Sequence, residues 1–320
     1  MATPNSTFTE MVSTTMRFHR RKVIDNVIEH NALLRLMKSQ GNFKTENGGY
    51  EITLPLAHSM NSTYQRFSGF DALNQSASEV ISAAKFDWMQ AAIHVVASGR
   101  EIRMNSGEEA MIKLVEARKK IAVTTATNKM SIDVYSDGAL ANQIGGLAAL
   151  VTTDGTGTVG GIVSGTYTFW KNKFEEVSGS GATFSTLKTA LNNQIKAVTK
   201  GADTTNLIVM SHDFHTVFEN GLTDLQRYAA ANTGALGFET LKYKSADVIF
   251  DDNSNFSTTA EKAYMLNTKY LYMIEHADAK WGSDGERIPT NQDAVVVPMF
   301  WMGNMATDNR RMNSVVIDAA

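Results

Sequence analysis

The spacing of apolar residues along the chain predicts several amphipathic helices. Residues 17–38 carry apolar side chains every three or four positions behind a basic leading end, which indicates a helix that begins near Arg20. The glycine-rich residues 41–49 then predict a turn. Residues 184–201 repeat the helical spacing and end on Lys200 and a glycine, the usual signal for a helix C-terminus.

The clearest helical signal covers residues 106–131. Ser106 is a good N-cap, and Glu109 three residues later completes a capping box. Basic residues gather in the C-terminal half, where the helix dipole favours them. The predicted apolar stripe consists of Met111, Leu114, Val115, Ile121 and Ala122.

Alternating apolar residues predict two long strands separated by a polar segment. The first covers residues 50–58, where one face carries Tyr50, Ile52, Leu54 and Leu56. Residues 81–99 read as a second, continuous strand. The segment between them is polar with isolated aromatic residues, so we expect residues 48–98 to form a long hairpin with a loose tip. A lone hairpin of this size is marginal in water and needs a surface to lie against.

From Asp137 onward, short helical and strand patterns alternate, which predicts an α+β or α/β region. Residues 206–211 read as a buried strand that leads into a helix capped by Ser211, and two further strands are expected at 246–252 and 262–277. We find no internal repeat and no low-complexity segment.

The segment from Ala294 to Ile317 is apolar almost without interruption until it reaches two adjacent arginines. Its run is too short to span a bilayer, which takes about 20 residues. We therefore expect a strand covered on both faces. Pro298 suits an edge or a bulge of a sheet, and Gly303-Asn304 suits a turn or bulge.

The amino-acid composition mainly excludes certain classes of function. With 320 residues, 43% hydrophobic and 20% charged, the chain has the makeup of a folded protein of one or two domains. The net charge of −3 gives no global attraction to nucleic acid or to an anionic membrane. The absence of cysteine excludes disulfides, thiolate metal sites and cysteine nucleophiles. No secretory signal precedes the first helix.

Two motifs suggest chemistry, and each has a simpler explanation. Gly155, Gly157 and Gly160 fit the G-x-G-x-x-G dinucleotide fingerprint, with Glu175/Glu176 at about the right distance. That fingerprint requires a strand before the glycines and a helix after them, and neither flank agrees. A glycine-rich loop between structural elements is the simpler reading.

The second motif places His212, His215 and Glu219 on one helical face, a set that can bind zinc or iron. The neighbouring Phe214 and Phe218 mark the buried side of the helix, so we expect the histidines at its edge or in solvent. A polar helix face after a buried strand is therefore the alternative. Common nucleophile, P-loop and H-E-x-x-H motifs do not occur.

The order of these parts resembles the major capsid proteins of tailed bacteriophages, which share the Hong Kong 97-like α+β fold. Three quoted segments carry the resemblance: "QIGGLAALVTTDGTGTVGGIVSGTYTFWKN" resembles the entry into the axial (A) domain, "NLIVMSHDFHTVFE" its strand–helix step, and "VVPMFWMGNMATDNRRMNSVV" the closing strands of the peripheral (P) domain. The resemblance implies five spans: an N-terminal arm (1–47), an E-loop hairpin (48–98), a P domain with a long spine helix and elongated sheet (99–136), a compact A domain (137–285), and closing P-domain strands (286–320).

The resemblance implies a structural protein without catalytic activity, metal or cofactor. Such a subunit self-assembles into hexamers and pentamers that form an icosahedral head around double-stranded DNA, without sequence-specific contacts and without a membrane. Expected partners are a separate scaffolding protein, a portal and a decoration or cement protein. The expected location is the virion capsid, assembled in the cytoplasm of a bacterial host. The alternatives are an encapsulin-type compartment shell and a soluble nucleotide- or metal-dependent enzyme.

The resemblance also indicates where subunits meet. Some relatives cross-link a lysine of the E-loop covalently, but no lysine lies between Lys44 and Lys85 here, so we expect non-covalent contacts. The candidates at the hairpin tip are Tyr64, Arg66, Phe67 and Phe70, unless these aromatics pack within their own loop. Arg310 and Arg311 are expected at the subunit boundary, where they would pair with acidic groups of the adjacent chain.

Overall fold

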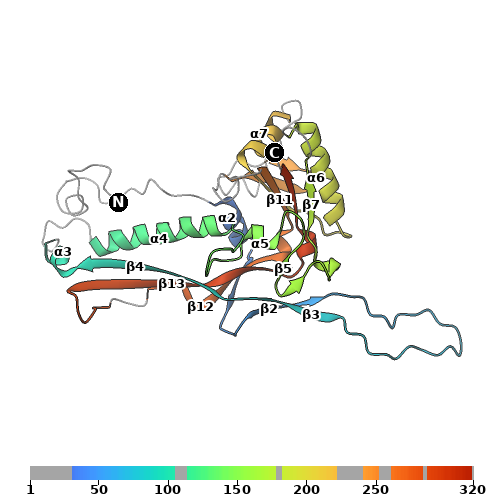
Figure 1. Cartoon of the computed structure of the whole chain (residues 1–320), viewed down its shortest axis with the longest axis horizontal. Coiled ribbons are helices and arrows are strands. Elements are labelled where there is room, and N and C mark those ends of the chain that lie inside the picture. The colour runs from blue at the N-terminus through green and yellow to red at the C-terminus, as the bar shows by residue number, and fades with distance from the viewer. Residues whose placement is uncertain are drawn as a thin grey trace.

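The computed structural model describes residues 31–104, 114–177, 182–221, 241–251, 261–283 and 287–318. Two sheets meet near the middle of an elongated molecule (Figure 1). One sheet extends with a long helix to one end, the other forms a helix-covered body, and a narrow two-stranded ribbon projects in the opposite direction from the long sheet. The predicted N-terminal segment up to residue 30 lies outside the described residues.

The long sheet has four strands. Their order across the sheet is β1 (Phe43–Glu46), β12 (Leu271–Ser283), β13 (Ala294–Thr307) and β4 (Met89–Ser98). β1 runs parallel to β12 in the segment predicted as a turn, so that prediction was wrong for these four residues. β13, the apolar run noted in the sequence, is central and pairs with β4 from Ala294 to Gly303.

Pro298 lies where the neighbouring strand on one side has ended. β12 pairs with β13 as far as Ser283↔Met299, so Pro298 is paired only with His94 of β4. Val296, two residues away, directs its N–H away from β4 and donates to the carbonyl of Arg287 at 2.8 Å. Because backbone direction alternates, the missing N–H of Pro298 points to that same side. This confirms the predicted edge-like position.

Helix α4 (Leu114–Asp133) lies along β4 (Figure 1). Its buried residues include Ala117, Ala122, Ala126 and Ser131, whose small side chains let the helix lie close to the sheet. Ile121, predicted to be in the stripe, is 41% exposed, while Ala122 is buried as predicted. The predicted N-cap, capping box and Met111 lie outside the described residues. None of the described helices, α4 included, is long and apolar enough to cross a bilayer.

The second sheet forms the body. Its six strands are, in order, β7 (Lys173–Glu176), β14 (Ser314–Asp318), β11 (Glu261–Leu266), β8 (Leu207–Met210), β10 (Ala246–Phe250) and β9 (Leu241–Tyr243). Helices α6 (Phe184–Val198) and α7 (His212–Gly221) pack on one face, through a cluster that includes Leu187, Phe214 and Met265. The predicted strand–helix step is therefore confirmed over 207–221, but the hydroxyl of Ser211, the predicted cap, forms no hydrogen bond among the described residues.

The closing segment was expected to return entirely to the long sheet, and that was wrong for β14. β13 belongs to the long sheet, but β14 pairs with β11 and β7 in the body. A short 3₁₀ turn, η3 (Arg310–Met312), joins the two strands. The C-terminal part of the chain thus links both sheets.

The second strand of the hairpin is interrupted, contrary to the prediction of one strand over 81–99. β2 (Ile52–Ala57) pairs with β3 (Ile81–Phe86), while β4 begins after Asp87-Trp88 and joins the long sheet. Asn304 of β13 holds this break, because its side-chain amide donates to the carbonyl of Asp87 at 2.8 Å. The division of the chain into five domains stays a prediction.

The ribbon β2–β3 alternates as expected along β2. Ile52, Leu54 and Leu56 face the core, but Tyr50, assigned to the same face, is 95% exposed. The predicted helix at 17–38 is not continuous, because Asn31 is not helical and α2 (Ala32–Ser39) begins after it; residues 17–30 lie outside the described residues. Asn31 has extended backbone, and its side chain caps the helix by accepting from the N–H of Leu34 at 2.9 Å.

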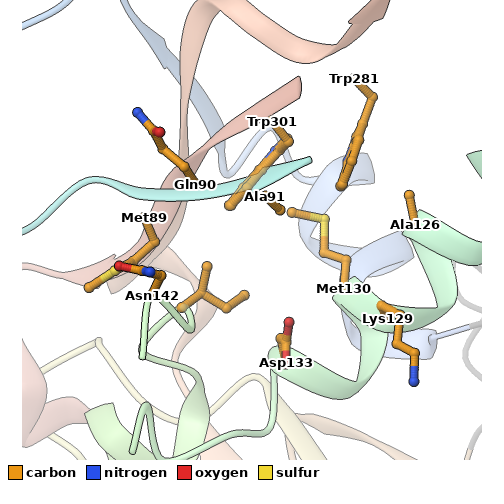
Figure 2. A pocket seen from close by; sticks show the side chains of 11 residues that line it. Met89, Gln90, Ala91, Ala126, Lys129, Met130, Asp133, Asn142, Trp281 and Trp301 are labelled. Carbon is orange, nitrogen blue, oxygen red and sulfur yellow. The ribbon is translucent and has the colours of Figure 1, made fainter. Parts of the chain in front are cut away.

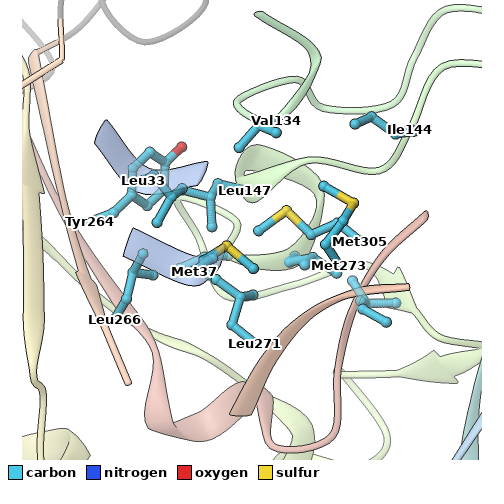
Figure 3. Packing of buried hydrophobic residues seen from close by; sticks show 14 of the residues in the cluster. Leu33, Met37, Val134, Ile144, Leu147, Tyr264, Leu266, Leu271, Met273 and Met305 are labelled. Carbon is cyan, nitrogen blue, oxygen red and sulfur yellow. The ribbon is translucent and has the colours of Figure 1, made fainter. Parts of the chain in front are cut away.

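One hydrophobic core connects the two sheets. Leu33 and Met37 of α2 lie between Tyr264 and Leu266 of the body and Met273 of the long sheet (Figure 3). All five are at most 2% exposed. The same cluster includes Phe86 of the ribbon and Trp170 of the glycine-rich region. The junction of both sheets is therefore a single packed unit from which the ribbon and the long sheet extend.

A carboxylate in an unfavourable charge environment, at the end of the body sheet, gives a first prediction. Glu261 lies opposite Asp318, and its pKa is raised by burial and by the negative charges of Asp213 and Asp318. Because the pKa of Glu261 is higher in the folded chain than in the unfolded chain, its ionised form destabilises the fold at neutral pH. This penalty disappears below about pH 4.5, where the carboxyl group is protonated in both states. We expect Glu261→Gln to stabilise the chain by under about 1 kcal/mol at pH 7 and not at pH 4. Urea midpoints at both pH values measure this.

The matched control for that prediction is Glu79→Gln, on the exposed hairpin. It removes one negative charge far from the body sheet and should leave both midpoints unchanged. A loss of stability in Glu261→Gln at pH 7 would contradict the assignment.

Candidate interaction surfaces

The tip of the projecting hairpin carries large apolar side chains that find no cover in the chain. Tyr64 is 80% exposed, Phe67 62% and Phe70 108%. The polar residues of the tip bond to each other instead: Gln65 donates to the carbonyl of Ala72, and the N–H of Ser68 donates to Asp71. The alternative that these aromatics pack within their own loop is therefore wrong. Arg66 lies between them on the same tip.

The structure adds further exposed apolar residues on the hairpin that the sequence reasoning did not single out. They are Tyr50, Met60, Leu73 and Ile81. Met60 and Leu73 lie in the polar segment, whereas Tyr50 and Ile81 were assigned to the predicted strands. Solvent-facing apolar side chains gathered in this way mark a surface that another molecule covers.

The long sheet has one covered and one open face. Val95 and Val297 pack against Ala122 of α4. The opposite face, here called the open sheet face, includes Val96 and Phe300, which are 47% and 37% exposed. A hollow of about 440 Å³ lies beside β4 and β13 and is lined by Trp88, Gln90, Ala91, Ala92, Asn142, Ala279, Phe300, Trp301 and Met302. Four of these residues also line a second hollow on the α4 side of the sheet, so this hollow does not belong to the open sheet face alone. The unbroken apolar run of β13 was the sequence signal for this second apolar face.

Arg310 does not lie at a surface. It is fully buried, and its guanidinium donates to the carbonyl of Leu150 at 2.6 Å and to the hydroxyl of Thr152 at 2.8 Å. Burial lowers its pKa to about 10, which still leaves it protonated at neutral pH. The expectation that Arg310 meets an adjacent subunit was therefore wrong: its donors are used inside its own chain.

Arg311 points elsewhere. It is exposed and lines a groove of about 310 Å³ between the ribbon and the body, together with His58, Phe169, Lys200 and Asp308. Burial raises the pKa of Asp308, although a hydrogen bond from Tyr272 at 3.2 Å partly opposes this. A neighbouring subunit could reach Arg311, so its role at a subunit boundary stays a prediction.

The glycine motif forms a hairpin and not a nucleotide-binding turn. β5 (Thr158–Val159) and β6 (Ile162–Val163) pair across Gly160 and Gly161, whose φ angles of 58° and 74° suit a two-residue type I′ turn. The short helix α5 (Leu147–Leu150) precedes the motif, and β6 follows it. The fingerprint needs a helix N-terminus directed at a phosphate, and this geometry does not supply one.

The histidine motif is divided between surface and core. His212 is exposed at the start of α7, while His215 is buried with its ring 5.1 Å from Phe250. The expectation that both lie at an edge or in solvent was wrong for His215. Within the part of the chain that the structure describes, no three His, Asp or Glu residues are placed to hold a metal ion.

A small, partly open hollow lies between α4 and the long sheet (Figure 2). Its volume is about 60 Å³, and Trp281 and Trp301 stack at one side with ring centroids 6.4 Å apart. Sites for small ligands occupy about 300–1,000 Å³. This hollow has room for a few water molecules and is a packing defect of the core.

Comparison with known proteins places the fold. No protein-family model matches the sequence, and no curated protein matches it. Among solved structures, the capsid of cyanophage P-SCSP1u aligns with a TM-score of 0.62 at 12% identity over 99% of this chain and 97% of that chain. The chain has a Hong Kong 97-like fold. The capsid of cyanophage A-1(L) aligns at 0.60 with 16% identity, over 97% of this chain and 99% of that chain.

The fold is also that of an encapsulin. The structure of the holo-SrpI encapsulin complex from Synechococcus elongatus PCC 7942 aligns with a TM-score of 0.62 at 8% identity, over 97% of this chain and 95% of that chain. Identities this low establish the shared fold alone. The predicted fold class is therefore confirmed.

Proposed function

We propose that the protein is the structural subunit of a closed shell, the major capsid protein of a tailed phage. In this proposal it assembles into hexamers and pentamers that form an icosahedral head around double-stranded DNA, and its place is the virion. A separate scaffolding protein, a portal and a decoration or cement protein are the proposed partners. We propose no catalytic role.

The hairpin tip is the observation that carries the proposal. The ribbon extends away from the core and ends in aromatic residues that are 62–108% exposed. A monomer gains nothing from such a tip, since each exposed aromatic side chain orders water that burial would release. In a shell, the tip of one subunit would lie on the open sheet face of the next, and both apolar surfaces would be covered.

Purification of the chain tests the proposal directly. Size-exclusion chromatography with light scattering should show capsomer-sized rings or megadalton particles, and negative-stain electron microscopy should show closed shells. A stable monomer of about 35 kDa at micromolar concentration would overturn the proposal.

A triple substitution tests the aromatic contact. We expect Tyr64→Ser, Phe67→Ser and Phe70→Ser together to raise the concentration needed for assembly at least about tenfold, because three buried aromatic contacts are lost at the interface. The melting temperature of the isolated subunit should stay unchanged, since these side chains are already exposed. Light scattering against concentration measures assembly.

The control for the triple variant keeps the aromatics and changes two exposed polar residues of the hairpin, Gln75→Ser and Ser76→Ala. It should assemble like the parent. If both variants assemble equally well, the aromatic side chains do not make the contact.

An encapsulin-type compartment is the second candidate, because the SrpI encapsulin aligns as well as the phage capsids do. The contents of the particles separate the two functions. Nuclease-resistant double-stranded DNA in particles from the native source supports a phage head, whereas a packaged enzyme supports a compartment.

A further inference from the structure

Arg310 organises a loop that is distant in sequence. Beyond Leu150 and Thr152, its guanidinium donates to the hydroxyl of Ser164 and to the carbonyl of Thr156 at 3.1 Å. These four acceptors belong to a single polar and glycine-rich stretch, residues 150–164. All four are neutral oxygens, and they accept hydrogen bonds from a rigid, planar donor. The negative charge of Asp154, in the same stretch, also favours the charged guanidinium and partly opposes the effect of burial on its pKa.

The same stretch touches the projecting ribbon. Its hairpin turn places the carbonyl of Gly160 2.9 Å from the N–H of Lys85 in β3. A Cβ atom at Gly160 would lie 3.0 Å from Cβ of Ala84 and 3.1 Å from the ring of Phe86, which shows how closely the turn is seated. Trp170 supports the turn from behind, since its indole N–H donates to the carbonyl of Val159 at 2.9 Å.

These contacts form a continuous path from the junction of the two sheets to the ribbon. Arg310 lies in η3, between the last strand of the long sheet and the last strand of the body. It holds residues 150–164, and these in turn hold β3 through Gly160. The glycine-rich stretch contains only the two-residue strands β5 and β6, so side chains outside it hold its shape. Asn172 donates to the carbonyl of Thr152 at 2.8 Å, and Arg310 contributes the largest set of these hydrogen bonds.

We propose that Arg310 is a positioning residue for the projecting hairpin: through the β5–β6 turn it fixes the angle at which the ribbon leaves the body. A buried charge whose hydrogen bonds all go to neutral acceptors is a costly way to gain stability, even with Asp154 nearby, and such groups can instead specify one conformation. In this case the conformation specified is that of the ribbon. The consequence for shell assembly rests on the proposed function, but the angle itself belongs to the single subunit.

A distance measurement tests the proposal. The chain contains no cysteine, so Ala77→Cys on the hairpin and Ala197→Cys on α6 provide two unique, exposed sites for spin labels. Pulsed dipolar spectroscopy, on labelled chain diluted in excess unlabelled chain, gives the distribution of distances between them. We expect one narrow population in the parent and a broader, shifted distribution in Arg310→Gln, with unchanged far-ultraviolet circular dichroism.

Arg311→Gln is the matched control, because it alters the adjacent, exposed residue of the same turn, whereas the hydrogen bonds to residues 150–164 come from Arg310. It should retain the distribution of the parent. Gly160→Ala acts at the other end of the path, where the added methyl group meets Ala84 and Phe86, and should shift the distribution while Arg310 stays in place.

A folded Arg310→Gln chain with the distribution of the parent would overturn the proposal and leave Arg310 as a purely stabilising residue. If Arg310→Gln does not fold, the double variant Thr152→Val, Ser164→Ala and the Gly160→Ala variant decide the matter: unchanged distributions in both overturn the proposal. These distances do not depend on assembly. If the parent chain forms no shells, the proposed function is overturned, but the proposal for Arg310 is not affected.

Discussion

Deletion of residues 58–76 should abolish closed shells and leave a folded subunit. The last pair of the ribbon, Ala57 and Ile81, would then be joined by residues 77–80, a four-residue loop of a common hairpin length. The deletion removes Met60, Tyr64 and Phe70, which are at least 80% exposed. Their loss costs the core little, so we expect the free energy of unfolding to change by about 1 kcal/mol or less.

The assembly defect should be much larger than that of the aromatic triple variant, because the deletion removes the reach of the ribbon as well as its contacts. Electron microscopy and light scattering measure shells, and urea unfolding measures the subunit. Two results would contradict the expectation: an unfolded chain would mean that the hairpin is part of the core, and normal shells would mean that the tip makes no contact between subunits.

The spacing of apolar residues correctly predicted those helices and strands that depend only on their own residues. The alternation in β2, the strand–helix step around Ser211 and the apolar run of β13 all follow from side-chain periodicity. The break after Phe86 does not, because apolar residues continue on both sides of Asp87-Trp88. What separates β3 from β4 is Asn304, more than 200 positions away, whose amide holds the carbonyl of Asp87.

The pairing of strands could not be predicted from the sequence either. β14 looks like a continuation of β13, yet it joins the other sheet, since pairing depends on which strands the fold brings alongside. The candidate interaction surface was predicted where exposure is local, at Tyr64, Phe67 and Phe70. The prediction was wrong for Arg310. Two adjacent arginines look alike in the sequence, and the oxygens that accept hydrogen bonds from the buried one lie some 150 positions away.

Gly303→Ala should destabilise the subunit more than any surface variant. A Cβ atom there would lie 2.4 Å from the carbonyl oxygen of Ile274 and 2.8 Å from the indole ring of Trp301, so either the backbone of β12 or the ring has to move. Gly303 lies opposite Glu275, where the register of β12 and β13 begins to shift. Glu275 also accepts a hydrogen bond from the Trp301 indole at 2.9 Å. Backbone, ring and carboxylate are thus displaced together.

We expect Gly303→Ala to lower the free energy of unfolding by about 3 kcal/mol, the upper end for overpacking a core. The near-ultraviolet circular dichroism of the stacked Trp281 and Trp301 should weaken with it. Gly165→Ala is the control, because its added methyl group meets nothing within 4 Å and its backbone is not left-handed, and it should be neutral or slightly stabilising. Equal urea midpoints for the two variants would mean that β12 and β13 can separate at this point without cost. In that case Gly303 would not set the register of the long sheet, and the register shift after Glu275 would have another cause.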